Sequence, residues 1–389
     1  MSACTLVVVT FWMITGSGVQ AGRAATLVLS GNETKIDLTT GGPRRLDSGQ
    51  PDSVSVLDFA KFPPTVTHLM DIPNSVIGPP SNIAITPDHR LALIANSIRL
   101  DPVNATNWVP ESFVHVLDLR ASPPRVVGRV QTGLQPSGLS ISDDGNRALV
   151  ADRAAGTVTV LGLDRQGTEV RRLASIPVCL PAESLSDVAI APGGRLAVAS
   201  VQKGSYLAIL KLTKDGGSFT GQKVSTYGQP YRVVITPDGE LALTAGQGFG
   251  NRLDRDALTV VSLKSDPICA TDYIALGAVP ESIELSPDGK LLVAVVMNGS
   301  NLGLGSPDRR SFGLMVVLVR KGATYRVAEE HRIGPIPEGV AFTGDGKYLV
   351  VQCHAERNLW VYKVRGQHLA DTGLRIAVPG FPSALRAAP

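Results

Sequence analysis

Residues 280–296 read PESIELSPDGKLLVAVV, and this stretch decides the fold of the chain. Ile283 and Leu285 alternate with polar residues, as in a half-buried strand, and residues 291–296 form an apolar return strand. Residues 286–289 between them read Ser-Pro-Asp-Gly, a turn in which Pro presets φ near about −65° and Gly leaves the turn with few steric limits. The stretch therefore predicts one β-hairpin.

The same hairpin recurs along the chain. The other copies are PSNIAITPDHRLALIAN from Pro80, PSGLSISDDGNRALVAD from Pro136, LSDVAIAPGGRLAVAS from Leu185, PYRVVITPDGELALTAG from Pro230 and PEGVAFTGDGKYLVVQC from Pro337. Successive copies begin about 45 to 57 residues apart, a period that is typical of propellers and solenoids. Each hairpin is followed by a third strand, plainest at residues 157–163, 257–263, 314–319 and 358–364, and then by a more polar fourth. Four strands per period without a helical pattern predict one propeller blade.

The two ends of the chain predict a further, shared blade. Residues 381–387 (FPSALRA) repeat only the opening strand, while residues 26–30, 53–59 and 66–72 supply the other three. A blade built from both termini would close the ring and leave no free sheet edge. The expected fold is all-β: a seven-bladed β-propeller with four-stranded antiparallel blades, forming a single domain over residues 26–389.

The N-terminus predicts export. Residues 6–14 (LVVVTFWMI) are too few to cross a bilayer, but with the following Val19-Gln20-Ala21 they fit a signal peptide over residues 1–21, with cleavage up to about residue 25. The alternative is a misassigned start or a buried first strand. With the signal, the protein is expected to be periplasmic or secreted. The mature chain keeps Cys179, Cys269 and Cys353, which leaves open one disulfide of unspecified pairing or three inert thiols.

The amino-acid composition restricts the kinds of partner that the protein is expected to bind. A hydrophobic content of 43% suits sheets stacked face to face. A net charge of +3 with scattered Lys and Arg gives no footprint for nucleic acid or for an anionic membrane surface. We therefore expect a monomer that binds a small-molecule ligand or a protein partner on its loop-rich face, with no nucleic acid and, after signal cleavage, no membrane.

Four insertions interrupt the repeat between the second and third strands, at residues 31–52, 96–113, 246–257 and 297–313. Because each strand reverses direction, these loops lie at the same end of a blade as the loops that enter its first strand. All four are therefore expected on one face, around one mouth of the central channel, where functional residues should be sought.

The first residues of the inner strands supply the catalytic candidates. Glu281 and Glu338 come from neighbouring blades, and two facing carboxylates would split their pKa values and give a general base or half of a cation site. Arg232 is expected to clamp an anion, and His354 to act as an auxiliary acid. The substrate-binding candidates are Asp187, Tyr231, Asn96, Asp152, Asn298 and Ser137.

Each candidate has a structural alternative. The acidic residues fit a water-filled channel equally well, Arg232 fits an ion pair with one of them, and His354 fits a loop hydrogen bond. The sequence contains no clustered His or Cys pattern for a metal, so no metal ligands and no cofactor are expected. The acidic mouth leaves a divalent cation open.

Blades that open Pro-x-x-hydrophobic-x-hydrophobic-Ser/Thr-Pro-Asp-Gly resemble the seven-bladed propellers of the lactonase, surface-layer (YVTN) and cytochrome d1-like superfamily. The resemblance covers essentially the whole mature chain, and the copies at Pro230 and Pro280 match best. It implies a lactonase-like hydrolase, or a cyclising isomerase or lyase, acting on a small anionic substrate at the channel mouth. The alternative that it implies is a non-catalytic scaffold that binds a protein partner, like the heavy chain of methylamine dehydrogenase.

Two departures from the superfamily bear on the activity. Lactonase-type members resemble one another in a His after the blade-opening Pro, whereas this chain has Ser81, Ser137, Tyr231, Glu281, Glu338 and Ser383 there. The Tyr-Val-Thr-Asn strand ending of the surface-layer group is replaced by LIAN at Leu93, LVAD at Leu149 and LVVQ at Leu349. The first departure puts hydrolysis of a phosphogluconolactone in doubt, as does the export signal.

Overall fold

The computed structural model describes residues 26–46, 49–75, 77–101, 103–104, 107–248 and 253–389. The signal peptide expected at residues 1–21 lies outside these ranges. Within them no helix is long and apolar enough to cross a membrane. The only helices of the described chain are two 3-10 turns, η1 (Pro181–Glu183) and η2 (His354–Glu356).

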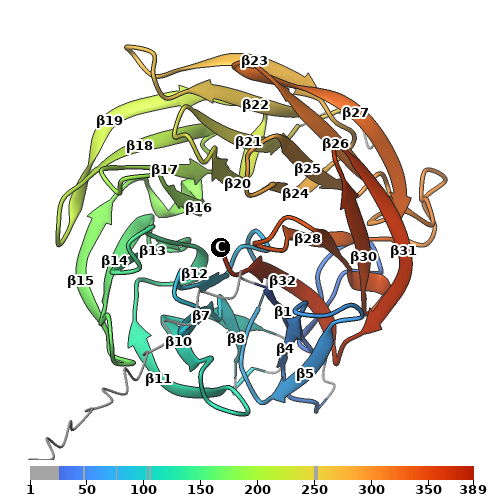
Figure 1. The fold of residues 1–389 in the computed structure, drawn as a ribbon, viewed down its shortest axis with the longest axis horizontal. Coiled ribbons are helices and arrows are strands. Elements are labelled where there is room, and N and C mark those ends of the chain that lie inside the picture. Colours follow the sequence, from blue (N-terminus) through green and yellow to red (C-terminus); the bar gives the residue numbers. More distant parts are fainter. Residues whose placement is uncertain (1–25, 47–48, 76, 102, 105–106, 249–252) are drawn as a thin grey trace, which may run out of the picture.

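The described strands form seven four-stranded antiparallel sheets arranged as blades in a ring (Figure 1). The first strands surround the centre: β6 (Ile83–Ile85), β12 (Pro136–Ile141), β16 (Leu185–Ile190), β20 (Gln229–Ile235), β24 (Pro280–Leu285), β28 (Pro337–Phe342) and β32 (Phe381–Ala387). The second strands are β7 (Leu91–Ala95), β13 (Arg147–Asp152), β17 (Leu196–Val201), β21 (Leu241–Gln247), β25 (Leu291–Val296), β29 (Tyr348–Cys353) and β1 (Leu27–Glu33).

The outer half of each blade completes the sheets. The third strands are β10 (Phe113–Asp118), β14 (Thr157–Leu163), β18 (Tyr206–Leu212), β22 (Ala257–Ser262), β26 (Gly313–Lys321), β30 (Asn358–Arg365) and β4 (Ser53–Asp58). The fourth strands are β11 (Arg125–Gln131), β15 (Val170–Pro177), β19 (Gly217–Ser225), β23 (Cys269–Ala275), β27 (Thr324–Ile333), β31 (His368–Ala377) and β5 (Thr65–Met70). We number the blades 1 to 7 in the order of these lists.

The predicted closure of the ring is confirmed. The seventh blade has the strand order β32-β1-β4-β5, so the C-terminal strand pairs with the N-terminal one. Gln352 of blade 6 ties this blade to its neighbour, because its Nε2 donates to Ser30 Oγ at 2.8 Å and to the carbonyl oxygen of Ala384 at 2.7 Å. Strands from both ends of the chain thus complete the same sheet, which closes the ring of blades.

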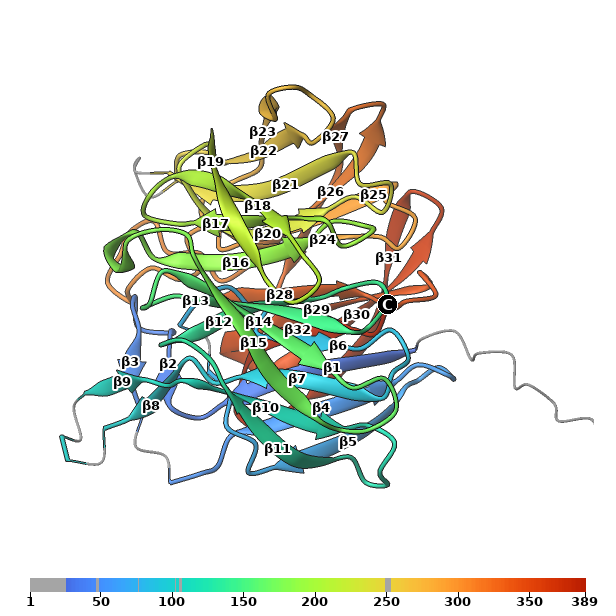
Figure 2. The same cartoon turned by 90° about the vertical axis from the view of Figure 1, so that its left-hand side faces the viewer.

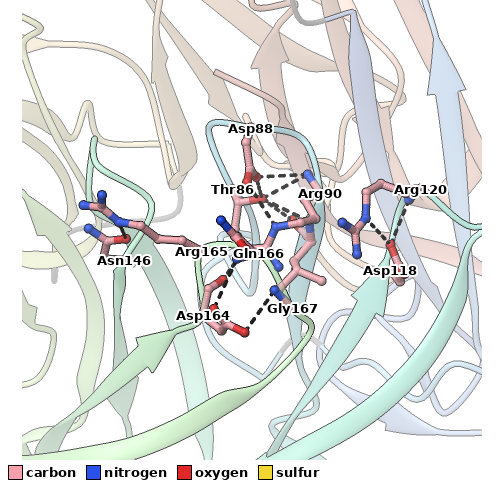
Figure 3. Close-up of polar contacts among 11 residues, drawn as sticks. Thr86, Asp88, Arg90, Asp118, Arg120, Asn146, Asp164, Arg165, Gln166 and Gly167 are labelled. Carbon is pink, nitrogen blue, oxygen red and sulfur yellow. Dashed lines mark hydrogen bonds and ion pairs between the residues drawn. The ribbon is translucent and has the colours of Figure 1, made fainter.

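The turn that identified the repeat is held by its own side chains. In blade 1, Thr86 Oγ1 donates to Asp88 Oδ1 at 2.6 Å, and the same oxygen accepts the backbone N–H of Arg90 at 3.1 Å (Figure 3). The Arg90 guanidinium also donates to the carbonyl oxygen of Asp164 in blade 2. The equivalent hydroxyl-to-Asp bond recurs in four further blades, from Ser142, Thr236, Ser286 and Thr343. A Ser or Thr two residues before an Asp therefore fixes the hairpin turn in the same way in these five blades.

The core lies between the blades. Seven apolar clusters fill the described chain, one for each pair of neighbouring blades. One of them joins Leu243 and Leu258 of blade 4 to Leu292 and Val316 of blade 5. Both faces of each sheet are buried, which explains the continuous apolar runs of the second strands.

The insertions lie on one face, as predicted. The small hairpins β2 (Ile36–Asp37) with β3 (Arg44–Arg45) and β8 (Ile98–Leu100) with β9 (Trp108–Pro110) project from the same side of the disc (Figure 2). A Cβ on Gly299 of blade 5 would lie 3.3 Å from Leu253 of blade 4, so the described parts of those two insertions touch. We call this side the insertion face.

All three described cysteines carry free thiols. Cys353 is buried, Cys179 is half-buried and Cys269 is exposed. The disulfide that the sequence left open is therefore not formed.

Candidate functional site

Equivalent residues of the blades form two rings at the insertion face. The first ring is the residue that follows the blade-opening Pro, which Leu185 replaces in blade 3: Ser81, Ser137, Ser186, Tyr231, Glu281, Glu338 and Ser383. The strand pairs Val233–Thr244, Ile283–Ala294 and Val340–Val351 fix a common register between first and second strands. The second ring is made of residues near the end of the second strands. Each lies three positions after the second-strand residue of such a pair: Glu33, Ser97, Arg153, Gln202, Gln247, Met297 and His354.

One side of both rings lines a cavity of about 310 Å³. The first ring contributes Tyr231, Glu281 and Glu338, and the second contributes Arg153, Gln202, Gln247 and Met297. Loop residues Leu38, Gly41, Gly42, Pro43, Ile77, Gly78, Val279, Asn301 and Ile336 complete the wall. The structure thus brings the two predicted glutamates and Tyr231 together at the channel mouth.

The two glutamates form an acid pair. Glu281 is 8% exposed and Glu338 is 1% exposed. Burial raises the pKa of Glu281 to about 8. Burial, together with the charge of Glu281 and then that of Glu33, raises the pKa of Glu338 well above its usual range. Burial therefore favours the protonated form of both carboxyls, and because the two groups interact they titrate as a pair.

Arg153 supplies the positive charge of this cavity. Its Nη2 donates to Gln202 Oε1, whereas its Nη1 is buried without a hydrogen-bond partner among the described residues. Burial lowers the pKa of Arg153, and the nearby Tyr231 hydroxyl partly offsets that effect. Glu338 Oε1 and Asn301 Oδ1 are likewise buried without described partners. Buried polar atoms are almost always paired in folded proteins, so three unpaired atoms at one cavity indicate a place for a ligand or for water.

Sequence reasoning missed Arg153, Gln202, Gln247 and Asn301. The first three stand at one position of the repeat, the position of His354, so aligning the second strands at their ends would have found them. Asn301 lies in the blade 5 insertion, for which the repeat offers no template.

Two predicted residues, Arg232 and Asp187, do not line this cavity. Arg232 is 1% exposed, and its guanidinium donates to Ser282 Oγ at 3.0 Å and to Glu284. Asp187 accepts the backbone N–H groups of Val188 at 2.9 Å and Val233 at 3.0 Å. Asp187 and Glu284 line a different cavity, of about 500 Å³, at the opposite end of the channel. Burial raises the pKa of Asp187 to about 6, although Arg232 opposes the shift.

His354 is buried beside the site but does not line the cavity. Its Nδ1 lies 3.3 Å from the carbonyl oxygen of Pro382, its Nε2 has no described partner, and its ring stacks on Phe381 with centroids 4.8 Å apart. Burial lowers the pKa of His354 to about 4, so the ring is neutral at neutral pH. Asn298 adopts a left-handed conformation with φ 51° and accepts a hydrogen bond from Arg310 Nη1 at 2.9 Å.

The remaining predicted residues lie elsewhere. Asn96 lines a separate cleft of about 460 Å³ between the blade 7 and blade 1 insertions. Asp152 accepts hydrogen bonds from Thr157 Oγ1 at 2.8 Å, Thr159 Oγ1 at 2.7 Å and the backbone N–H of Gly133 at 3.0 Å. Ser137 belongs to the first ring, on the side covered by Gly78, whose added Cβ would lie 2.1 Å from Ser137 Oγ.

The described residues contain no group of three or more His, Cys, Asp or Glu side chains placed to hold a metal ion. The two carboxyls beside one arginine that line the cavity are groups suited to acid–base chemistry.

Comparisons with known proteins identify the fold. No protein-family model matches the chain, and no curated protein matches it. A proposed 6-phosphogluconolactonase from Bacteroides uniformis is 17% identical with a TM-score of 0.70, over 94% of this chain and 100% of that one. The periplasmic gluconolactonase of Pseudomonas aeruginosa is 17% identical with a TM-score of 0.68, over 93% and 98%. The hydrazine synthase of Kuenenia stuttgartiensis is 16% identical with a TM-score of 0.60, over 81% and 94%.

These similarities show the fold alone, because proteins with the same fold can have many different functions. The chain is a seven-bladed β-propeller, and its fold is similar to that of these structures named as gluconolactonases.

Proposed function

We propose that this protein is an enzyme that opens or forms a lactone, or a similar C–O bond, in a small anionic substrate at the insertion-face mouth. The observation that carries the proposal is the acid pair Glu281 and Glu338 in one cavity with Arg153, whose Nη1 has no described partner. Structural neighbours named as gluconolactonases support the choice of reaction class.

The roles follow from charge. Arg153 is the only Lys or Arg among the described residues that line the cavity, so an anionic substrate group would take its free Nη1. In the sequence-based prediction Arg232 held this role, which stays untested. Its bonds to Glu284 and Ser282 favour a structural part for Arg232.

The acid pair would divide the proton transfers of hydrolysis. With one proton on the pair, the ionised carboxylate takes a proton from water as the water oxygen bonds to the acyl carbon. The acyl C–O bond of the ring then breaks, and the protonated partner gives its proton to the leaving oxygen. Lactone plus water becomes a hydroxy acid, and the pair again holds one proton. Cyclisation is the same sequence reversed.

The test is a screen of five- and six-membered lactones that carry a carboxylate or phosphate group, followed by acid release at constant pH. We expect turnover by the wild-type protein, a loss of at least about 100-fold in kcat for Glu281→Gln or Glu338→Gln, and a raised KM for Arg153→Met. Unchanged rates in both glutamine variants would remove the assignment.

A second candidate is a non-catalytic scaffold for a protein partner. Val103, Leu180 and Leu304 are 94%, 69% and 75% exposed, and all three lie in loops of the insertion face. Exposed apolar side chains of this kind suit a protein interface. A scaffold would show no turnover, and its melting temperature would not respond to small lactones or hydroxy acids.

In either role we infer a periplasmic or secreted, monomeric protein without nucleic-acid or membrane partners. The inference rests on the signal-like residues 1–21 and on the balanced charge of the chain.

A further inference from the structure

The outer wall of the site comes from two insertions and not from the blades. Leu38, Gly41, Gly42 and Pro43 of the blade 7 insertion line the cavity, and Asn301 of the blade 5 insertion lines it as well. We call residues 38–43 together with residues 301–303 the roof. Beneath it, Glu281 and Glu338 are almost fully covered.

A single side chain joins the two halves of the roof. Arg309 Nη1 donates to the carbonyl oxygen of Thr39 at 3.0 Å, across 270 positions of sequence, and the same nitrogen donates to the carbonyl oxygen of Leu302. One guanidinium from the blade 5 insertion thus holds backbone of both insertions.

The backbones also touch at two glycines. A Cβ on Gly41 would lie 2.6 Å from the Cα of Gly303, closer than real Cβ atoms approach another atom, and Gly41 has φ 103°. No side chain interlocks the halves at this point. The halves meet here by surface contact, and the Arg309 bonds add hydrogen bonds across that contact.

Each half is braced separately from the other. In the blade 7 half, Asp37 accepts the backbone N–H of Thr39 at 2.8 Å and Arg44 Nη2 at 2.8 Å. In the blade 5 half, Arg310 Nη1 donates to Asn298 Oδ1 at 2.9 Å. Because the internal bonds would survive, the halves can part as formed units when the Arg309 bond to Thr39 breaks.

We propose that the roof is a lid latched by Arg309, and that this latch sets the largest ligand that reaches Glu281 and Glu338. The inference rests on the proposed function for the location of the ligand. The cavity beneath the roof has a volume of about 310 Å³, which suits a free small molecule, and the two glutamates within it are almost fully covered. Arg309 is thus a specificity-determining residue that does not take part in the chemistry.

Carbodiimide labelling of the two glutamates tests the latch without turnover. Protonated carboxyls react with carbodiimides, and coupling to an added amine is read by peptide mass spectrometry. A small dialkyl carbodiimide is compared with a bulkier cyclohexyl-morpholinoethyl carbodiimide in the full-length protein. Arg309→Met is compared with Arg310→Met, the matched control, which loses a bond inside one half only.

We expect Arg309→Met to label Glu281 and Glu338 at least about 10-fold faster than the wild type, and to admit the bulky reagent that the wild type excludes. Arg310→Met should label like the wild type, and Arg309→Lys should restore part of the size selection. Hydrogen exchange should rise in residues 38–43 of Arg309→Met but stay unchanged in strands β24 and β28, which separates lid opening from unfolding.

Wild-type labelling rates in Arg309→Met, or equal access of both reagents to the wild type, would overturn the latch. So would a rise in exchange that spreads through the strands. The two proposals can be contradicted separately. The labelling experiment requires no substrate, so it tests the latch alone, and the lactone screen tests the enzyme activity whether or not the roof opens.

Discussion

The side-chain nitrogen of Gln247 lies 3.4 Å from Oε2 of Glu281, and each residue belongs to a different ring around the channel mouth. An amide N–H facing a carboxylate oxygen favours the ionised form of that carboxyl. Gln247 therefore opposes the burial that raises the pKa of Glu281 to about 8.

Replacing Gln247 by Leu should move the pH dependence of activity upward. The ionised carboxylate is the base in the proposed reaction, so the rate should rise with pH through about 8 in the wild type. Without the donor, the midpoint should move to higher pH by less than about one unit. A pH–rate profile of kcat/KM measures it. A midpoint that falls, or a rate that decreases between pH 6 and 8, would contradict the assigned base.

The acid pair should make folding stability fall with rising pH. Both pKa values are raised in the folded protein, so the folded state binds more protons than the unfolded state between the ordinary glutamate value of 4.5 and about 8. Stability is then greatest near or below pH 4.5, as far as these groups contribute, and is lost as pH rises through about 8.

Glu281→Gln and Glu338→Gln should reduce this slope. At pH 8.5 each variant should be more stable than the wild type, by about 1 to 3 kcal/mol, because the amide needs no proton to stay neutral. Urea unfolding at pH 6 and 8.5 checks it. Identical slopes for the wild type and both variants would show that the carboxyls are not protonated in the folded state.

Gly138 of blade 2 lies so close to Asp187 of blade 3 that no side chain fits at this position. A Cβ at this position would lie 1.8 Å from Asp187 Oδ1 and 2.8 Å from the Cα of Asp187. Gly138→Ala should therefore destabilise the protein by about 2 to 4 kcal/mol. Gly42→Ala is the control, since nothing lies within 4 Å of its added Cβ. Equal melting temperatures for the two variants would contradict the packing described between blades 2 and 3.

Substitution of Arg232 should mainly reduce stability, whereas substitution of Arg153 should mainly weaken anion binding. Arg232→Met leaves Arg386, at 3.6 Å, as the only described cation beside Glu284, and should cost about 3 to 5 kcal/mol of stability. Arg153→Met removes a half-buried cation with an unpaired nitrogen, and should change stability by less than about 1 kcal/mol while weakening the binding of anions. Thermal unfolding with and without a saturating hydroxy acid distinguishes them. A stable Arg232→Met variant that no longer binds anions would show that Arg232, and not Arg153, binds the anionic group.

The fold could be predicted because the sequence contains six copies of the same hairpin, and the end of the chain repeats its opening strand. The strands expected at residues 157–163 and 381–387 have those bounds in the structure, as Thr157–Leu163 and Phe381–Ala387. Ser/Thr-Pro-Asp-Gly turns are local signals, so the sequence contains all that fixes them.

The site could be predicted only in part, for two physical reasons. Tyr231 and Arg232 are consecutive in one strand, and consecutive side chains point to opposite faces, so only one of them lines the mouth. The same alternation places Asp187 toward the neighbouring blade and Ser186 in the ring. The roof could not be predicted at all, because its contact joins Thr39 to Arg309 through loops whose course no repeat constrains.

The protonation of the acid pair is tested most directly by a carbon NMR titration of a protein labelled at the side-chain carboxyls of glutamate. We predict two glutamate carboxyls with apparent pKa values well above the usual range, of which the lower lies near about 8 and is assigned to Glu281 by its absence in Glu281→Gln. A spectrum in which every glutamate carboxyl of the folded protein is ionised by pH 6 would contradict the account, because the channel mouth would then hold two charged carboxylates and no protonated pair.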